Sequence, residues 1–271
     1  MSEKAPPSAF RPEIPPRANG LRRPFTGLAE RFRLPDGLQS PRYASIRYWD
    51  RSSSPVASSS RRTELAPVVL VHGYGGTHIM WTPLREALES VGFDCLIALR
   101  YNASRMGIEA VADLLVDRAK RAMAATGINR VHLVGHSLGG LVVREAVQRR
   151  GLAGLTSTAV TIAAPHAGAR LARFVPGPAA RQMCPGSAFL KQLDQLPVDR
   201  STHWVAIQGR SDRVVPHYST AFDAASPATV TIRQSNGGHR SIARHPQVVS
   251  FIVEQLLHTE SPVREAFSLA A

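Results

Sequence analysis

The sequence lacks any hydrophobic run long enough to cross a membrane. A transmembrane helix needs about 18 or more consecutive apolar residues, and no such run occurs in the 271 residues. Residues 1–32 also lack the apolar centre of about 7 to 15 residues that marks a secretory signal. Arg22 and Arg23 precede polar and charged residues, so a twin-arginine signal is not indicated. We therefore expect a cytoplasmic protein.

Cysteine is scarce. The sequence has two cysteines, Cys95 in an apolar run and Cys184 in a loop-like segment. Two residues so placed support neither a disulfide framework nor a thiolate metal site. We expect Cys95 to be a small buried hydrophobe and Cys184 a free thiol. The sequence predicts no metal site and no cofactor.

Acidic residues are few relative to basic ones. There are 20 Asp and Glu against 33 Lys and Arg, a formal charge of +13, and only Lys4, Lys120 and Lys191 are lysines. Such a charge can attract nucleic acid or an anionic membrane. Basic and aromatic residues do not interleave as they do in nucleic-acid platforms, so no nucleic-acid partner is predicted. A solvated arginine-rich surface is the simpler interpretation, and weak association with an anionic membrane is the alternative.

The first 65 residues differ in composition from the rest. They are rich in proline and include the Ser/Arg run RSSSPVASSSRR at 51–62. Little in this segment can form a core, so residues 1–65 are predicted to be a disordered extension. The alternation in 43–50 favours at most one edge strand. A folded domain is expected over 66–258, followed by a tail at 259–271.

Apolar strand-like runs alternate with helix-like segments in residues 67–258. The runs at 67–72, 93–99, 130–136, 157–164, 203–209 and 228–234 predict strands, and the segments at 82–91, 107–125, 138–150 and 245–258 predict helices, with Thr82 as a possible N-cap. Near-continuous apolar runs are typical of strands buried on both faces. The alternation therefore predicts an α/β fold with a mostly parallel central sheet and helices on both faces.

The run VHLVGHSLGGLVV, residues 131–143, places Ser137 where a predicted strand meets a predicted helix. Such a sharp turn strains the backbone of the serine and presents its hydroxyl above the sheet. Side chains two residues before and after would clash, which explains Gly135 and Gly139. A serine in a tight turn without any chemistry is the alternative, and the motif alone does not decide between them.

A nucleophilic serine needs a base, and the base needs an orienting carboxylate. Asp212 follows the strand at 203–209, and His239 follows the strand at 228–234. Both loops leave the carboxyl edge of the sheet, where Ser137 also lies. We therefore predict a catalytic triad of Ser137, Asp212 and His239. The rival acids and bases lie at less suitable positions in the chain order: Asp199, Asp223, His217 and His245.

The glycine-rich turn HGYGG at 72–76 follows the first strand of the domain. One backbone N–H of this loop, together with the backbone N–H of the residue that follows the nucleophile, would form an oxyanion hole. The predicted donors are the amides of Tyr74 and Leu138. His72 is expected to brace the turn. The residues predicted to line the substrate site are His72, Gly73, His136, Phe174 and Met183, with His166 either lining it or structural.

Residues 166–200 are expected to form a small cap segment over the site. Their apolar side chains could form a wall for an acyl chain, or they could simply pack over the sheet. The sequence leaves both interpretations open for the six residues concerned: Leu171, Phe174, Val175, Met183, Phe189 and Leu190.

Five segments occur in an order that resembles the α/β-hydrolase superfamily. They are LVHGYGGTHIMW, LVGHSLGGLVV, TIAAPHAGARLA, GRSDRVVP and GGHRSI. The likeness covers about residues 66–258. Within the superfamily, the segments are most similar to those of bacterial triacylglycerol lipases and esterases, and MCPGSAFLKQL resembles the short cap segment of such lipases. It implies an α/β-hydrolase fold, a catalytic domain at 66–258 and the triad and oxyanion donors named above. It also implies a serine hydrolase that cleaves carboxylic or lipid esters without a cofactor.

Two other functions stay open at this point. An acyltransferase or thioesterase acting on carrier-bound acyl groups would use the same triad, and acyl carriers are acidic partners that a basic surface would suit. A catalytically silent binding protein is disfavoured because all three triad positions are present.

Overall fold

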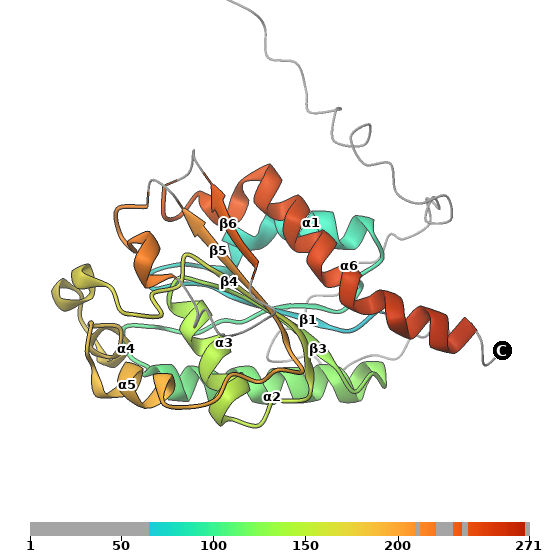
Figure 1. The fold of residues 1–271 in the computed structure, drawn as a ribbon, viewed down its shortest axis with the longest axis horizontal. Coiled ribbons are helices and arrows are strands. Elements are labelled where there is room, and N and C mark those ends of the chain that lie inside the picture. The colour runs from blue at the N-terminus through green and yellow to red at the C-terminus, as the bar shows by residue number, and fades with distance from the viewer. Residues whose placement is uncertain (1–64, 210–211, 221–229, 235–237, 269–271) are drawn as a thin grey trace, which may run out of the picture. The chain divides into compact units, whose positions relative to one another are not determined.

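The computed structural model describes residues 65–209, 212–220, 230–234 and 238–268, with the backbone alone at 230–234 and 261–268 (Figure 1). The predicted extension and the possible strand at 43–50 lie outside the described residues, except for Leu65, which is buried. Asp223 and the side chain of His217 also lie outside them.

Six strands form one sheet: β1 (Val68–Val71), β2 (Leu96–Ala98), β3 (Val131–His136), β4 (Thr156–Ile162), β5 (His203–Gly209) and β6 (Val230–Gln234). Their order is β2-β1-β3-β4-β5-β6, and every neighbouring pair is parallel. The prediction of a parallel sheet is confirmed. From β1 the chain continues to β2 on one side, and from β3 it continues to β4 on the other side. Such a switch point opens a crevice at the carboxyl edge of the sheet.

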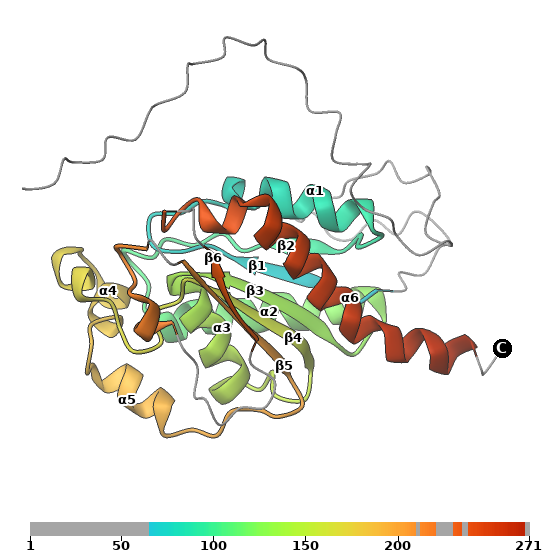
Figure 2. The same cartoon turned by 45° about the horizontal axis from the view of Figure 1, so that its top comes forward.

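Helices cover both faces of the sheet, as predicted. One face carries α1 (Thr82–Ser90) and α6 (Pro246–Ser268), and the other carries α2 (Ile108–Thr126) and α3 (Leu138–Arg149) (Figures 1 and 2). Because strand side chains alternate, Val68 and Leu70 pack with the first pair, while Val69 and Val71 pack with the second.

Two helix boundaries differ from prediction. Thr82 lies inside α1 and is not its N-cap; its hydroxyl donates to the carbonyl of Ile79. Helix α6 runs to Ser268, so the expected tail at 259–271 begins within it. Pro262 lies within this helix, although proline usually interrupts one. No helix in the described part of the chain has the length and hydropathy to cross a bilayer.

The cap segment 166–200 contains η2 (Arg170–Phe174), α4 (Pro178–Gln182) and α5 (Ala188–Asp194). Its side chains divide into two sets. Met183, Phe189 and Leu190 are buried in the cluster that includes α2 and α3. Leu171, Phe174 and Val175 are exposed. The packing interpretation therefore holds for the second half of the cap. η2 and Val175 present exposed apolar surface, and an acyl wall formed by them stays a prediction.

Polar contacts fix the cap to the helices beneath. The amide of Ile108 at the start of α2 donates to the Gln182 side chain over 2.7 Å. The buried Arg144 of α3 donates to the carbonyl oxygen of Leu193 over 3.2 Å and pairs with Asp194 at 2.9 Å. A buried guanidinium that lost these partners would be costly, so the contacts hold α5 firmly against α3.

Candidate active site

Ser137 has a strained backbone between β3 and α3. Its φ is 54° and its ψ is −121°, a combination that non-glycine residues rarely adopt. A Cβ on Gly135 would overlap the carbonyl of Gly139, and a Cβ on Gly139 would overlap that of Val71. A Cβ on Gly140 would overlap the Ala164 side chain. The glycines therefore let α3 begin directly over the sheet.

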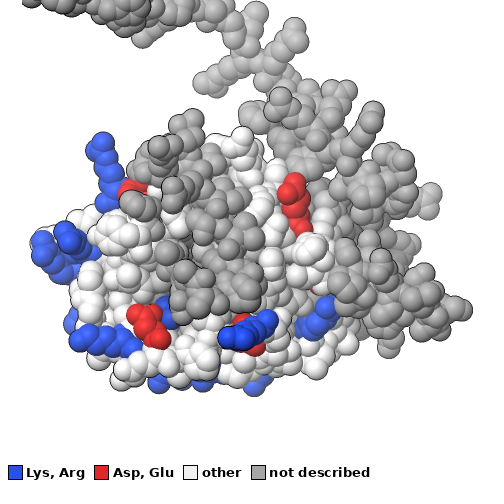
Figure 3. Space-filling model, viewed as in Figure 1, with Lys and Arg blue, Asp and Glu red and all other residues white. Residues whose placement is uncertain are grey.

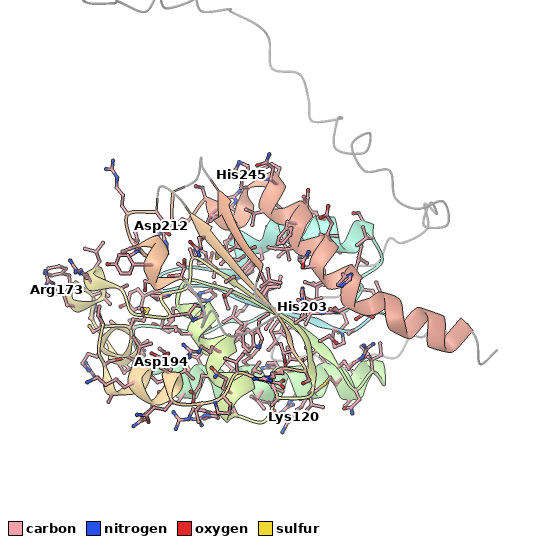
Figure 4. All side chains as sticks on the ribbon, viewed as in Figure 1. Lys120, Arg173, Asp194, His203, Asp212 and His245 are labelled. Carbon is pink, nitrogen blue, oxygen red and sulfur yellow. The ribbon has the colours of Figure 1, made fainter. Side chains whose placement is uncertain are left out.

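His239 joins Ser137 to Asp212. Its Nε2 lies 2.9 Å from Ser137 Oγ, and its Nδ1 lies 2.7 Å from Asp212 Oδ2. Asp212 leaves the end of β5 (Figure 4), and its side chain is 1% exposed. Three residues predicted from separate motifs are thus brought into one hydrogen-bonded row, the geometry in which a histidine can accept a serine proton.

The carboxylate of Asp212 is held ionised by its surroundings. Burial by itself would raise its pKa, but the hydrogen bond from His239 and backbone amides outweigh burial, and the net pKa is lowered. The amides of Val214 and Val215 donate to Oδ1 over 2.8 and 3.0 Å. Because Oδ1 is fixed in this way, Oδ2 is aimed at the imidazole.

The turn after β1 lies against the serine. A Cβ on Gly73 would lie 2.9 Å from Ser137 Cβ, closer than real side chains approach. Leu138 is the first residue of α3, so its N–H has no acceptor within the helix. The N-terminus of a 12-residue helix therefore faces the same place as the backbone of the 72–76 turn.

His72 is buried behind this turn and borders the hollow beside it. Its Nδ1 lies 2.9 Å from the carbonyl oxygen of Gly73, and its ring stacks on Tyr101 with centroids 4.3 Å apart. The Tyr101 hydroxyl donates to the His72 carbonyl oxygen. Burial lowers the pKa of His72. A hollow of about 290 Å³ opens beside this turn, and it is lined by His72, Tyr74, Gly75, Gly76, Tyr101, Asn102, Ala103 and Ser104.

His136, which the sequence predicted as a substrate contact, lies beneath the His239 loop. Its Nε2 is 2.7 Å from the carbonyl oxygen of His239. Burial, followed by the nearby His239, lowers the pKa of His136 to about 4. Its ring is therefore neutral near pH 7, and Nε2 donates to the carbonyl. Its Nδ1 has no hydrogen-bond partner among the described residues.

The other predicted positions are spread more widely. Phe174 is 69% exposed on η2, and Met183 is buried in the core. His166 is buried, with Nε2 3.2 Å from Thr161 Oγ1, and burial lowers its pKa. The rival acid Asp199 lies at the opposite edge of the sheet, where it accepts hydrogen bonds from Ser201, Thr202 and the amide of Gly154.

One contact across the site has no signal in the sequence. The Tyr74 hydroxyl donates to the carbonyl oxygen of Pro176 over 2.7 Å, although the two are 102 residues apart. Gly177 (φ 100°) fits against Ser104, where a Cβ would overlap its carbonyl. The cap loop therefore lies beside the 72–76 turn. Within the described ranges no three His, Cys, Asp or Glu side chains gather as metal ligands would.

A parallel sheet with a strained serine between strand and helix, and an acid and a histidine at the same edge, is the α/β-hydrolase fold. Residues 68–196 match the model of the alpha/beta hydrolase family. A triacylglycerol lipase of Burkholderia plantarii is 35% identical over 133 residues, 46% of this chain and 36% of that protein. The chain has the α/β-hydrolase fold, and its residues 68–196 are similar to the alpha/beta-hydrolase family and to bacterial lipases.

Other comparisons agree on the fold. A triacylglycerol lipase of Pseudarthrobacter phenanthrenivorans is 36% identical over 118 residues, 40% of this chain. Both matches cover 36% of the lipase, so the aligned segment is about a third of each relative. The mature lipase BlEst2 of Bacillus licheniformis superposes with a TM-score of 0.61 at 17% identity, covering 75% of this chain and 96% of that one. Lipase B of Aspergillus fumigatus superposes with a TM-score of 0.63 at 14% identity, covering 73% of this chain and 54% of that one.

Proposed function

We propose that the chain is a serine hydrolase that cleaves carboxylic esters through an acyl-enzyme. The observation that carries the proposal is the row Ser137–His239–Asp212, with both contacts of the imidazole at hydrogen-bond distance. A buried carboxylate on Nδ1 leaves Nε2 free of its proton and able to accept that of the serine. The lipase-like relatives support the same class of reaction.

The first half-reaction forms the acyl-enzyme. His239 takes the proton of Ser137 while the oxygen attacks the ester carbonyl. The amides of Leu138 and Tyr74 donate to the oxyanion, and each such donor in related enzymes is worth about 3 kcal/mol of transition-state stabilisation. The imidazolium, stabilised by Asp212, then protonates the leaving alcohol as the C–O bond breaks.

The second half-reaction releases the acid. A water molecule gives its proton to His239 and attacks the acyl carbonyl in the same oxyanion hole. The tetrahedral intermediate collapses, the bond to Ser137 Oγ breaks, and the serine recovers its proton from His239. The cycle consumes one water per ester and requires no cofactor.

An ester with an apolar acyl part is the proposed substrate. Phe174 and Val175 expose apolar surface immediately before Pro176, whose carbonyl is bound to Tyr74. That contact holds the loop that carries these apolar side chains at the tip of the Tyr74 side chain, and the proposed path of the acyl chain runs along this loop. The cytoplasmic location remains a prediction from the sequence.

The test is hydrolysis of p-nitrophenyl esters of graded acyl length by the wild type and Ser137→Ala. Loss of the nucleophile in a triad lowers kcat by about 10⁶-fold, so Ser137→Ala is expected to show only residual turnover. Ser241→Ala, a serine in the loop after His239, is the matched control and should retain activity. Equal turnover by wild type and Ser137→Ala would refute the proposal.

Transfer of the acyl group to an acceptor other than water is the second candidate. Its support is the formal charge of +13, which suits an acidic acyl carrier. Product analysis with a thioester donor and an alcohol acceptor separates the two, because in dilute aqueous acceptor a hydrolase yields mainly the free acid and a transferase mainly the acylated acceptor.

A further inference from the structure

The loops at the carboxyl edge of the sheet are nearly free of acidic residues. We call them the rim: residues 72–81, 99–107, 163–187, 212–220 and 238–245. Their one carboxylate is that of Asp212, which is hydrogen-bonded to His239. The rim carries eight arginines, all of them exposed: Arg100, Arg105, Arg170, Arg173, Arg181, Arg213, Arg240 and Arg244.

The opposite edge of the sheet shows no such bias. Its loops, 91–95, 127–130, 150–155 and 195–202, hold the acids Asp94 and Asp199 and the bases Arg130, Arg150 and Arg200. Arg150 is paired there with Asp113 and Glu145. The positive charge is therefore a property of the active-site edge and not of the whole domain. Figure 3 shows basic side chains gathered at the left-hand end, where Figure 4 labels Arg173.

The rim also carries the exposed apolar side chains. Six large hydrophobic residues are exposed in the described part of the chain, and every one lies in the rim: Ile79, Leu171, Phe174, Val175, Val214 and Tyr218. They come from three separate loops. Exposed apolar side chains that gather at one end of a molecule, rather than being scattered singly, mark a surface that meets a protein or a membrane.

Charge and apolar surface are interleaved at close range. The guanidinium of Arg173 lies over the Phe174 ring, 4.6 Å from its centroid. A guanidinium of Arg240 lies 3.7 Å from the place where a Cβ of Gly75 would be, at the mouth of the site. At a membrane surface, apolar side chains enter the acyl boundary while arginines remain at the level of the headgroups.

We propose that the rim docks on an anionic lipid surface and that ester substrates enter the site from that surface. The proposal rests on the proposed hydrolase function, since it supplies the substrate to the same serine. The charge of an acidic carrier protein would complement the arginines, but binding such a protein would not explain the six exposed apolar side chains of the rim. The observations therefore favour a lipid surface, and the carrier protein becomes an outcome of the test.

The test measures co-sedimentation of the full chain with vesicles of ether-linked phospholipid. The alkyl chains of this lipid are not attached by ester bonds, so the proposed hydrolase does not remove them. One set of vesicles is phosphatidylcholine alone, and the other contains phosphatidylglycerol as well. The rim variant is Arg170→Gln with Arg173→Gln. The matched control is Lys120→Gln with Arg121→Gln, which removes the same charge from α2, where Figure 4 labels Lys120 far from Arg173. Every protein tested keeps residues 1–65.

The wild type and the control are expected to bind anionic vesicles alike, and added salt should weaken that binding. Each arginine near an anionic surface strengthens binding about fivefold, so loss of two should weaken the binding of the rim variant about 25-fold. Leu171→Ser with Phe174→Ser should weaken binding by about tenfold, on neutral vesicles too. Unchanged thermal unfolding would show that the variants fold.

Equal binding by the rim variant and the control would overturn the proposal, because the charge of residues 1–65 would then account for the binding. No binding by the wild type would overturn it as well. So would binding to an acidic acyl carrier protein without binding to vesicles. Hydrolysis of a soluble p-nitrophenyl ester by the wild type tests the proposed function separately, since it needs no vesicle.

Discussion

At the residue scale, the site depends on one strained residue and the space around it. Ser137 holds a positive φ because Gly135, Gly139 and Gly140 leave no side chain in the way of α3. A strained backbone persists only when its surroundings fix it. Here the amide of Ser137 donates to the Ile162 carbonyl oxygen over 2.8 Å, which anchors the turn to β4.

The orientation of His239 depends on its two other contacts. Asp212 accepts from Nδ1, and His136 donates to the backbone carbonyl of His239. The sequence could predict Asp212 and His239, because chain order and the ends of strands place them at one edge. It could not predict the role of His136, which depends on a contact between residues 103 positions apart.

The variant Asp212→Asn tests the orienting acid. An amide nitrogen facing Nδ1 would favour the tautomer with its proton on Nε2, which cannot accept the serine proton. We expect kcat on a p-nitrophenyl ester to fall by about 10⁴-fold with little change in KM. The matched control is Asp199→Asn, the rival acid at the opposite edge, which should retain kcat. A greater loss from Asp199→Asn would contradict the assignment.

At the element scale, strands and cap differ in how far sequence predicts them. The six strands were predictable because their apolar runs are bounded by polar or glycine-rich turns. The cap was not, because the apolar residues of 166–200 show no period that separates a buried face from an exposed one. Phe174 and Met183, both expected to meet substrate, have opposite environments, one exposed and one in the core.

The hydroxyl of Tyr74 is the contact between the 72–76 turn and the cap loop. Tyr74→Phe removes its hydrogen bond to Pro176 and leaves the ring, at a cost of about 1 kcal/mol. We expect faster amide hydrogen exchange over 170–177 and a raised KM for long-chain esters, with little change in thermal unfolding. Unaltered exchange in the cap loop would show that this bond does not hold the loop.

At the scale of the whole molecule, four buried histidines link stability to pH. Burial lowers the pKa of His72, His132, His136 and His166. For His132, burial outweighs the Glu260 carboxylate 2.8 Å from Nε2, which by itself would raise the pKa. Their pKa values in the folded chain lie below the unfolded value of about 6.5. The unfolded chain therefore binds more protons between these values, and the free energy of unfolding falls as pH drops below about 6.5.

For His136 alone the expected loss is roughly 3 kcal/mol between about pH 6.5 and its folded pKa of about 4. Urea unfolding of the wild type and of His136→Gln between pH 7.5 and pH 4 measures this loss. In His136→Gln the amide can still donate to the His239 carbonyl but does not titrate, so its stability should decline less steeply with acid. A wild-type stability that stays level over this range would contradict the assignment of neutral buried histidines.

The central claim is that Ser137 is the nucleophile, and covalent trapping tests it most directly. The full chain is treated with a fluorophosphonate, which reacts with activated serines, and the labelled peptide is identified by mass spectrometry. The account predicts one phosphonyl group per chain, attached to Ser137, and none in His239→Ala. A wild-type chain that hydrolyses esters but carries no label on Ser137, or carries it on another serine, would contradict the account.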